Sequence, residues 1–370
     1  MERSDHEVGP RSRARKAPGI TRSRNSVMSV RVGINGFGRI GRNFLRAVIE
    51  QQVKTGKKDI DFVAVNDLTT IETLSHLLKY DSVMGQLPNS VKVSKNGITV
   101  DGDEFLVLAQ RDPKALPWAD LGVDIVVEST GIFTDRDKAA LHVEAGAKRV
   151  IVSAPSAGAD ATFVVGVNED DFDPKKHIVV SNASCTTNCF VPMIKVLDDA
   201  FGVEKGLMTT VHAYTGDQSL VDGPHKDLRR ARAAAINIIP SSTGAARATS
   251  LVLPTMKGRL DGQSLRVPVP TGSITDFTGL LKQDVTVDQV NAAFKAAGAK
   301  GRLKGILHYT TDEIVSSDVV GTPYSCTYDA QLTQVIGNMV KVFGWYDNEW
   351  GYSNRLVDLV RYMGKKSPKR

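Results

Sequence analysis

The stretch Gly36-Phe37-Gly38-Arg39-Ile40-Gly41 has the pattern G-x-G-x-x-G and decides the fold of the N-terminal half of the chain. Residues 29–35, directly before it, alternate between apolar and polar side chains and predict a strand. Residues 40–53 carry apolar side chains at helical spacing, and residues 60–65 predict a second strand. A unit of strand, turn, helix and strand of about 35 residues is long enough for a parallel βαβ crossover. The glycine pattern therefore lies in the context that makes it informative.

The glycines and one carboxylate of this unit predict dinucleotide binding. Gly36, Gly38 and Gly41 allow a tight turn and a close approach of the backbone to a pyrophosphate, whose charge is held by the amides of the helix N-terminus. Asp67 follows the second strand, 26 residues after Gly41. A carboxylate at that place can bind the adenosine ribose and repel a 2′-phosphate, which favours NAD over NADP. The plainer interpretation of Asp67 is a turn or capping residue.

The rest of the chain divides into two regions. Up to about residue 184, predicted strands alternate with predicted helices, as in a doubly wound α/β fold of the Rossmann type. We therefore expect an NAD-binding domain at residues 29–184, completed by a C-terminal helix at 348–370, and an α+β catalytic domain with a mostly antiparallel sheet at 185–347. The further predicted strands are residues 91–108 (a hairpin turning at Lys95-Asn96-Gly97), 123–127, 150–152, 178–180, 206–213, 263–268, 273–281 and 335–343, and the further predicted helices are residues 136–145, 241–253, 287–297 and 349–363.

Charge and cysteine content argue against several classes of protein. The 370 residues carry a net charge of +6, of which seven basic and three acidic residues at positions 1–28 contribute +4. We expect this basic tail to be disordered rather than a secretory or organellar signal, and nucleic-acid binding is the less favoured interpretation of its charge. No apolar run is long enough to span a bilayer. Three cysteines make no disulfide framework and favour a reducing compartment, hence the cytoplasm.

Cys185 is the candidate nucleophile. It lies in Ser181-Asn182-Ala183-Ser184-Cys185-Thr186-Thr187-Asn188-Cys189, a polar run that is followed by an apolar one and predicts the start of a helix. The positive end of a helix dipole favours a thiolate and is expected to lower the pKa of the thiol. The alternative is a small buried hydrophobe. Among seven histidines, His212 is a candidate base because it ends an apolar strand and precedes a polar loop, where an imidazole can face a cleft.

Two further segments can bind anions. Residues 241–246 place hydroxyls and backbone amides before a helix, and Arg266 is a cation in an otherwise apolar strand. A basic cluster at residues 225–232 could contact nucleic acid, or it could order against acids of its own fold or of a neighbouring subunit.

Together these segments resemble the glyceraldehyde-3-phosphate dehydrogenase family. The resemblance spans about residues 30–363, and its motifs are specific in combination. They are VGINGFGRIGR (32–42), AVNDL (64–68), ESTGIF (128–133), VSNASCTTNC (180–189), TTVHAYT (209–215), SSTGAA (241–246), LRVPVP (265–270) and WYDNEWGYSNR (345–355). The resemblance implies oxidation of D-glyceraldehyde 3-phosphate by NAD+ through a cysteine thioester, which inorganic phosphate cleaves to 1,3-bisphosphoglycerate. A related alternative oxidises erythrose 4-phosphate and hydrolyses the thioester.

The resemblance also implies residue roles, a homotetramer and no metal. Cys185 would be the nucleophile and His212 the base, while Cys189 gains no catalytic role. Pro224 and the basic cluster would lie on a loop that borders the neighbouring subunit's cofactor site. Cofactor contacts would come from Gly36, Gly38, Arg39, Ile40, Gly41, Asp67, Arg111, Ser129, Thr130 and Asn348. The attacking phosphate would be bound by Ser184, Thr186, Thr243 and Gly244, and the phosphate of the substrate by Thr215 and Arg266.

Overall fold

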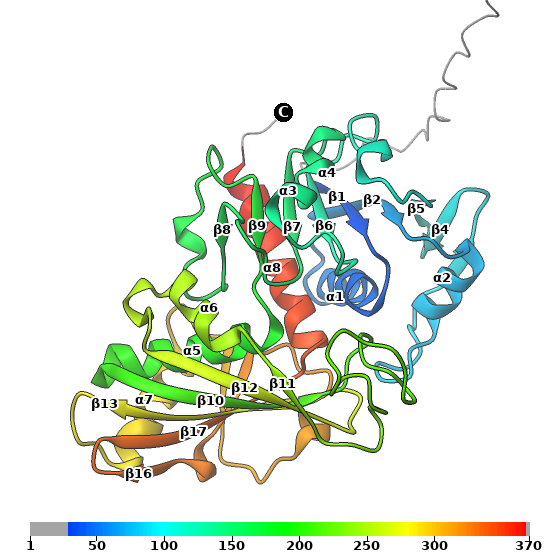
Figure 1. The fold of residues 1–370 in the computed structure, drawn as a ribbon. Helices are drawn as coiled ribbons and strands as arrows, with labels where there is room; N and C mark the ends of the chain where they lie inside the picture. The colour runs from blue at the N-terminus through cyan, green and yellow to red at the C-terminus, as the bar shows by residue number, and fades with distance from the viewer. Residues whose placement is uncertain (1–28, 368–370) are drawn as a thin grey trace, which may run out of the picture.

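Two sheets, each covered by helices, make up the protein (Figure 1). The computed structural model describes residues 29–367. The predicted basic tail at 1–28 and the end of the predicted C-terminal helix at 368–370 lie outside these residues. The predicted fold class, a doubly wound α/β unit followed by a unit with a mostly antiparallel sheet, is confirmed.

Sheet A contains nine strands in the order β3-β4-β5-β2-β1-β6-β7-β9-β8. From β5 to β8 the neighbouring strands are parallel, whereas β3, β4 and β5 form an antiparallel meander that includes the predicted hairpin. The carboxyl ends of β1, β2 and β6 therefore lie side by side, which is where a doubly wound sheet binds ligands. The strands are β1 (Val30–Asn35), β2 (Ile60–Asn66), β3 (Val91–Val93), β4 (Gly97–Val100), β5 (Asp103–Leu108), β6 (Ile125–Glu128), β7 (Arg149–Val152), β8 (Ala161–Thr162) and β9 (Val179–Ser181).

Sheet B contains eight strands in the order β11-β12-β10-β13-β17-β15-β14, with β16 paired to β17. Most pairs are antiparallel, but β10 with β12 and β14 with β15 are parallel. The strands are β10 (Val203–Ala213), β11 (Ile239–Ser242), β12 (Leu260–Val267), β13 (Ser273–Leu281), β14 (Leu307–Thr310), β15 (Cys326–Asp329), β16 (Gln334–Ile336) and β17 (Met339–Tyr346).

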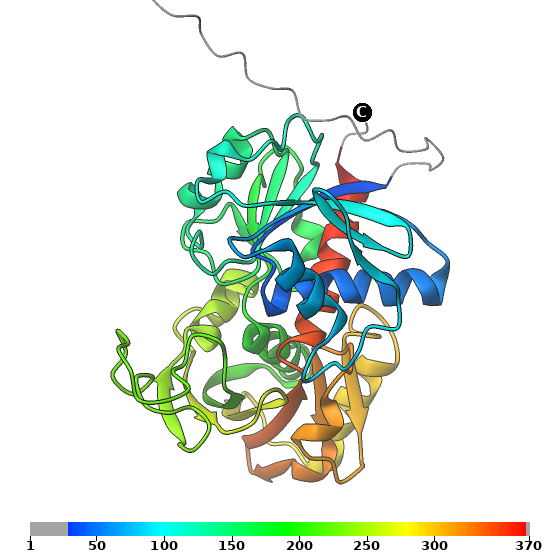
Figure 2. The same cartoon turned by 90° about the vertical axis from the view of Figure 1, so that its right-hand side faces the viewer.

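The helices connect and cover the two sheets. In Figure 2 the C-terminal helix runs from the level of sheet B up beside sheet A, and it packs on α1 and β1. This placement supports the expected completion of the first domain by the C-terminal helix, although the domain boundaries stay a prediction. The helices are α1 (Arg39–Thr55), α2 (Ile71–Lys79), α3 (Arg136–Ala139), α4 (Leu141–Glu144), α5 (Cys185–Phe201), α6 (Ala245–Val252), α7 (Val287–Ala299) and α8 (Trp350–Lys366), and short 3₁₀ helices cover Pro113–Ala115, Glu169–Asp171, Pro254–Met256, Ser316–Val319 and Ala330–Leu332.

Three predicted elements differ from the structure. The helix expected at 241–253 begins only at Ala245, because residues 241 and 242 pair with β12 as the end of β11. The strand expected at 335–343 is a hairpin of β16 and β17, in which Gly337 adopts a positive φ of 59° at the turn. The helix expected at 136–145 is divided into α3 and α4 at Ala140.

Candidate active site

Cys185 and His212 meet between α5 and sheet B. Cys185 is the first residue of α5, as the sequence predicts, and the N-cap is Ser184, whose hydroxyl accepts from the Thr187 amide at 3.0 Å. His212 lies near the end of β10 and is 3% exposed. The Sγ atom of Cys185 is 3.4 Å from Nε2 of His212. The sequence therefore predicted two groups that the fold brings into contact across 27 residues of chain.

The imidazole has a defined orientation. Its Nδ1 is 2.6 Å from the carbonyl oxygen of Ala213, a distance at which a proton must lie between the two atoms. Nδ1 therefore donates to this carbonyl, and Nε2 keeps its lone pair toward the sulfur. Arg266 Nη1 lies beside this pair, 3.1 Å from both the Ala213 carbonyl oxygen and Nδ1, and donates to the carbonyl. The arrangement leaves His212 ready to accept the thiol proton.

Burial dominates the electrostatics of this pair. It raises the pKa of the Cys185 thiol, although the nearby Arg266 guanidinium and hydrogen bonds from Thr186 act in the opposite direction. Burial, together with the Arg266 charge, lowers the pKa of His212 to about 3. The backbone amides at the helix N-terminus act to lower the thiol pKa, as predicted, but the expected net lowering was wrong, because desolvation of the sulfur outweighs them. A proton that moves from Sγ to Nε2 creates two opposite charges in contact, so the thiolate and the imidazolium stabilise each other as they form.

Tyr346 contacts both α5, which carries Cys185, and β10, which carries His212. Its hydroxyl is 2.8 Å from the hydroxyl of Thr186 on α5 and 2.8 Å from that of Thr210 on β10. Its ring also packs edge-on against His212, with centroids 5.9 Å apart. Thr186, a predicted phosphate ligand, thus turns its hydroxyl toward this buried contact.

Two arginines, Arg266 and Arg230, lie near His212. Arg266 Nη1 donates to the Thr215 hydroxyl at 2.9 Å, which brings together the two residues predicted for the substrate phosphate. Arg230 donates to Ser241 Oγ at 2.7 Å and to Asp217 Oδ2 at 2.6 Å. Within residues 29–367, the Nε atom of Arg266 is buried without a hydrogen-bond partner. A buried guanidinium with an unfilled donor fits an anionic ligand.

The other predicted phosphate residues lie at two helix N-termini that approach each other. Ser184 caps α5, and Gly244 is the N-cap of α6 with no side-chain cap. The two helix starts touch where the Thr187 hydroxyl lies 3.5 Å from the Ala245 carbonyl oxygen. Gly244 is exposed and a Cβ atom added to it would meet nothing within 4 Å, so there is open space beside this helix N-terminus. Thr243 accepts from the Ala245 amide through its hydroxyl at 3.2 Å.

The glycine-rich turn fits a pyrophosphate. Gly36 has φ of +90°, and a Cβ atom at Gly41 would lie 2.3 Å from the Gly36 carbonyl oxygen, so both positions require glycine. Gly38, the N-cap of α1, faces open space, and no side chain or first-turn acid neutralises the positive end of the helix. Ile40 lies in the first turn of α1. Asp67 accepts from the Phe37 amide at 2.9 Å, so the carboxylate lies directly beside the turn.

Two of the remaining predicted cofactor residues, Arg39 and Ser129, lie beside this turn. The Arg39 guanidinium is held by Asp81 at 3.0 Å and by Glu349 at 2.5 Å, so only the backbone of Arg39 is left for the pyrophosphate. Arg111 is exposed in the loop after β5. Ser129 follows β6, and its hydroxyl donates to the Gly36 carbonyl oxygen at 2.8 Å.

Asn348 has a fixed carbonyl group. Its Oδ1 accepts from the Ser273 hydroxyl at 2.9 Å and from the Gly272 amide at 3.2 Å. This leaves the NH₂ group as the donor that a nicotinamide carboxamide could use.

Sequence reasoning missed two residues of the site. Arg230 was placed only in a basic cluster that could contact nucleic acid or order against acids, and its bond to Asp217 supports ordering against an acid of its own fold. Tyr346 alternates inward on β17, and a buried tyrosine requires a partner for its hydroxyl.

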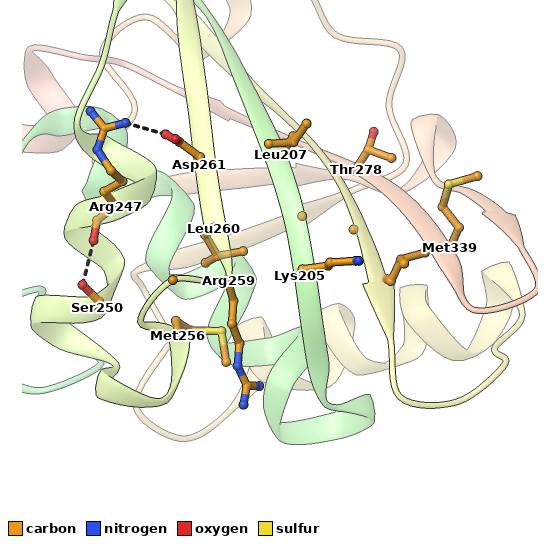
Figure 3. Close-up of a pocket in the computed structure, with 14 residues that line it drawn as sticks. Lys205, Leu207, Arg247, Ser250, Met256, Arg259, Leu260, Asp261, Thr278 and Met339 are labelled. Atoms are coloured by element: carbon orange, nitrogen blue, oxygen red, sulfur yellow. Dashed lines mark hydrogen bonds and ion pairs between the residues drawn. The ribbon is translucent and has the colours of Figure 1, made fainter.

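Other features of the described residues lie apart from this site. A cavity of about 680 Å³ lies at the far end of β10 and β13, lined by Lys205, Leu207, Arg259 and Met339 among others (Figure 3). Within residues 29–367, no group of three or more His, Cys, Asp or Glu side chains is placed to hold a metal ion. No helix in the same range has the length and apolar character needed to cross a membrane.

Comparisons with known proteins agree with the resemblance found in the sequence. Residues 30–136 match the family described as "Glyceraldehyde 3-phosphate dehydrogenase, NAD binding domain", and residues 184–348 match its C-terminal domain. A protein of Streptomyces coelicolor named glyceraldehyde-3-phosphate dehydrogenase is 61% identical over 340 residues, covering 92% of this chain and 100% of the relative. A protein of the same name from Mycobacterium tuberculosis is 61% identical over 340 residues, covering 91% of this chain and 99% of the relative.

Proposed function

The chain belongs to the glyceraldehyde-3-phosphate dehydrogenase family, and we propose that Cys185 and His212 perform its reaction by covalent catalysis. As a member of this family, the chain oxidises glyceraldehyde 3-phosphate with NAD as cofactor. The observation that supports the residue roles most strongly is the 3.4 Å contact between Sγ and Nε2, next to the hydrogen-bonded pair of Arg266 and Thr215.

We propose the following roles for the residues of the chain. Sγ of Cys185 attacks the aldehyde carbon, and the thiol proton passes through Nε2 of His212 to the carbonyl oxygen, giving a thiohemiacetal. His212 then takes the hydroxyl proton as a hydride leaves that carbon, and a thioester on Cys185 results. When bound, NAD+ supplies the acceptor for this hydride. Because burial and Arg266 lower the pKa of His212, its ring is neutral at pH 7, and Nε2 can accept the proton when the thiolate that forms beside it stabilises the imidazolium.

Phosphate cleaves the thioester in the second half of the reaction. An oxygen of inorganic phosphate attacks the acyl carbon, the carbon–sulfur bond breaks, and the imidazolium returns its proton to the sulfur. The products are 1,3-bisphosphoglycerate and the free Cys185 thiol. Ser184, Thr186, Thr243 and Gly244 are proposed to bind the attacking phosphate, because they lie at the two converging helix N-termini. Thr215 and Arg266, with Arg230 behind them, are proposed to bind the phosphate of the substrate.

Omitting phosphate separates this mechanism from the hydrolytic alternative with erythrose 4-phosphate. We expect a burst of NADH of at most one equivalent per site without phosphate, and steady turnover on addition of phosphate. The measurement is NADH absorbance with each of the two aldehydes. Sustained turnover without phosphate, or a preference for erythrose 4-phosphate, would contradict the phosphorylating mechanism.

Asp67 is proposed to select NAD over NADP. In Asp67→Gly the preference for NAD should fall by roughly tenfold, which corresponds to about 1.4 kcal/mol of lost repulsion toward a 2′-phosphate. Because Asp67 also accepts from the Phe37 amide, Asp67→Asn is the matched variant that removes the charge and keeps an acceptor for the turn. The ratio of kcat/KM with NAD to that with NADP measures the effect. An unchanged ratio in both variants would show that the carboxylate does not select the cofactor.

We also propose that the chain forms a homotetramer in the cytoplasm. The loop around Pro224 carries the exposed apolar residues Leu220, Val221, Leu228, Ile236 and Ile238, each at least 68% exposed. Leu207, beside the cavity of Figure 3, is 68% exposed on sheet B. Exposed apolar surface of this extent is typical of subunit interfaces. The free thiols of the three cysteines support a reducing compartment.

The sheet B surface offers a test of the assembly. We expect Leu207→Glu to reduce the assembly to smaller species, because it places a charge in an apolar contact between copies. Val53→Glu, at a position 76% exposed on α1, is the matched control and should leave the assembly intact. Light scattering coupled to size-exclusion chromatography gives the masses. A monomeric unmodified chain at micromolar concentration would refute the proposal.

A further inference from the structure

A buried carboxylate lies under the cofactor turn, at the carboxyl end of β6. Glu128 is 2% exposed and lies against His142, which is fully buried. Burying a carboxylate is costly unless donors fill its oxygens. Here Oε2 accepts from Asn35 Nδ2 at 2.6 Å and lies 2.9 Å from His142 Nε2, while Oε1 accepts from the Thr130 amide at 2.8 Å and from the Thr130 hydroxyl. Each oxygen of the Glu128 carboxylate is therefore close to two hydrogen-bond donors.

Trp118 fixes the direction of these hydrogen bonds. Its Nε1 is 3.0 Å from Nδ1 of His142, and an indole N–H can only donate. Nδ1 must therefore accept, so Nε2 carries the proton and donates to Glu128. The chain of donors runs in one direction, from Trp118 through a neutral His142 to the carboxylate.

A second arm of the network leads to the adenosine side of the site. The Asn35 Oδ1 atom accepts from Asn66 Nδ2 at 2.7 Å. Asn66 in turn binds the backbone of Gln110, accepting from its amide at 2.8 Å and donating to its carbonyl at 2.9 Å. Asn66 precedes Asp67 and Gln110 precedes Arg111, so this arm ends next to two proposed cofactor residues.

The first arm ends on the segment that packs against the glycine-rich turn. A Cβ atom at Gly36 would lie 2.6 Å from the Thr130 amide nitrogen, so Thr130 touches the turn directly. The Ser129 amide donates to the Asn35 carbonyl oxygen at 2.7 Å. Apart from its start at Trp118, the network therefore ends at or next to proposed cofactor residues.

We propose that Glu128, oriented by His142, is a positioning residue for NAD that acts through Thr130 and Ser129. It holds the segment after β6 against the glycine-rich turn, so that this segment is ordered before the cofactor binds. Pre-ordering raises affinity because less conformational freedom is lost on binding. The inference rests on the function proposed above, since the cofactor roles of Ser129 and Thr130 belong to it.

Variants of the two central residues test the inference. In Glu128→Gln an NH₂ group replaces one carboxylate oxygen and faces the donors that this oxygen had accepted from. In His142→Leu the hydrogen bonds to Trp118 and to Glu128 are both lost. Each should raise the Kd for NAD roughly tenfold, the fold-change expected for unsatisfied buried partners. His142→Gln keeps one acceptor toward Trp118 and one donor toward Glu128, so it should restore the Kd to within about threefold of the original value. Isothermal titration of the purified protein with NAD gives these values without relying on turnover.

A control separates positioning from general stability. Tyr328→Phe removes buried hydrogen bonds to Asn291 and Thr333 in the sheet B region, so it should lower the Tm and leave the Kd for NAD unchanged. The KM for NAD should rise with the Kd in Glu128→Gln, whereas the KM for the aldehyde should not. Should Glu128→Gln fail to fold, Trp118→Phe interrupts the same chain of donors and should weaken NAD binding several-fold.

Three outcomes are distinguishable. If Glu128→Gln and His142→Leu bind NAD as tightly as the unmodified chain, or if Tyr328→Phe weakens NAD binding equally, the positioning role is refuted. If His142→Gln behaves like His142→Leu, the directional network is refuted. If the unmodified chain itself binds no NAD, the proposed function fails instead.

Discussion

Cys185→Ala should abolish NAD reduction, lowering kcat by roughly 10⁴ or more, while the Kd for NAD stays within about threefold. The Cys185 thiol forms the covalent bond to the substrate, and the His212 imidazole cannot replace it. NAD binding is retained because the glycine-rich turn and the residues around it lie on sheet A, away from the sulfur. Steady-state rates and isothermal titration measure the two quantities.

Cys189 provides the matched control for this prediction. It lies one turn further along α5, is fully buried, and its Sγ faces the Gly344 carbonyl oxygen at 3.5 Å. Cys189→Ala should therefore retain most of the activity. If Cys185→Ala remained active, or if Cys189→Ala were the inactive variant, the assignment of the nucleophile would be wrong.

His212→Asn should slow the chemical step by roughly 10²–10⁴, the usual contribution of a positioned acid–base group. The amide cannot accept a proton from the sulfur, and burial keeps the thiol protonated without a base nearby. The same substitution should slow alkylation of Cys185 by iodoacetamide at pH 7. Pre-steady-state NADH formation measures the chemical step directly.

A histidine outside the site controls for the loss of an imidazole. His308 is exposed on β14 and stacks on Tyr324 with ring centroids 4.8 Å apart. His308→Asn should leave both rates unchanged. Equal alkylation rates in His212→Asn and the unmodified chain would show that His212 does not activate the sulfur.

The elements that could be predicted from the sequence are those that neighbouring residues determine. The G-x-G-x-x-G pattern marks a turn in which Gly36 and Gly41 have no room for a side chain. The polar run around Cys185 likewise indicates a helix start, which Ser184 caps in the structure. The strand pairing of residues 241 and 242 is different, because β12 decides it from more than twenty residues away. Tertiary pairing there overrides the helical tendency of the segment.

The electrostatic state of the site could not be predicted in the same way. The helix dipole at Cys185 is evident from the sequence, whereas the burial that outweighs it depends on how α5, β10 and β17 pack around the sulfur. Arg230 shows the same limit. Its basic cluster left open whether it contacts nucleic acid or acids, and only the folded loop directs Arg230 to Asp217 and Ser241. Side chains from distant segments define these properties.

Mass spectrometry of the acylated protein and its peptides tests the central claim most directly. The chain is mixed with glyceraldehyde 3-phosphate and NAD+ in the absence of phosphate, quenched in acid, and digested. We predict one phosphoglyceroyl group per chain on the peptide that contains Cys185, and its loss on addition of phosphate before the quench. An acyl group on another residue, or NADH formation with no acylated protein at any time, would contradict covalent catalysis by Cys185.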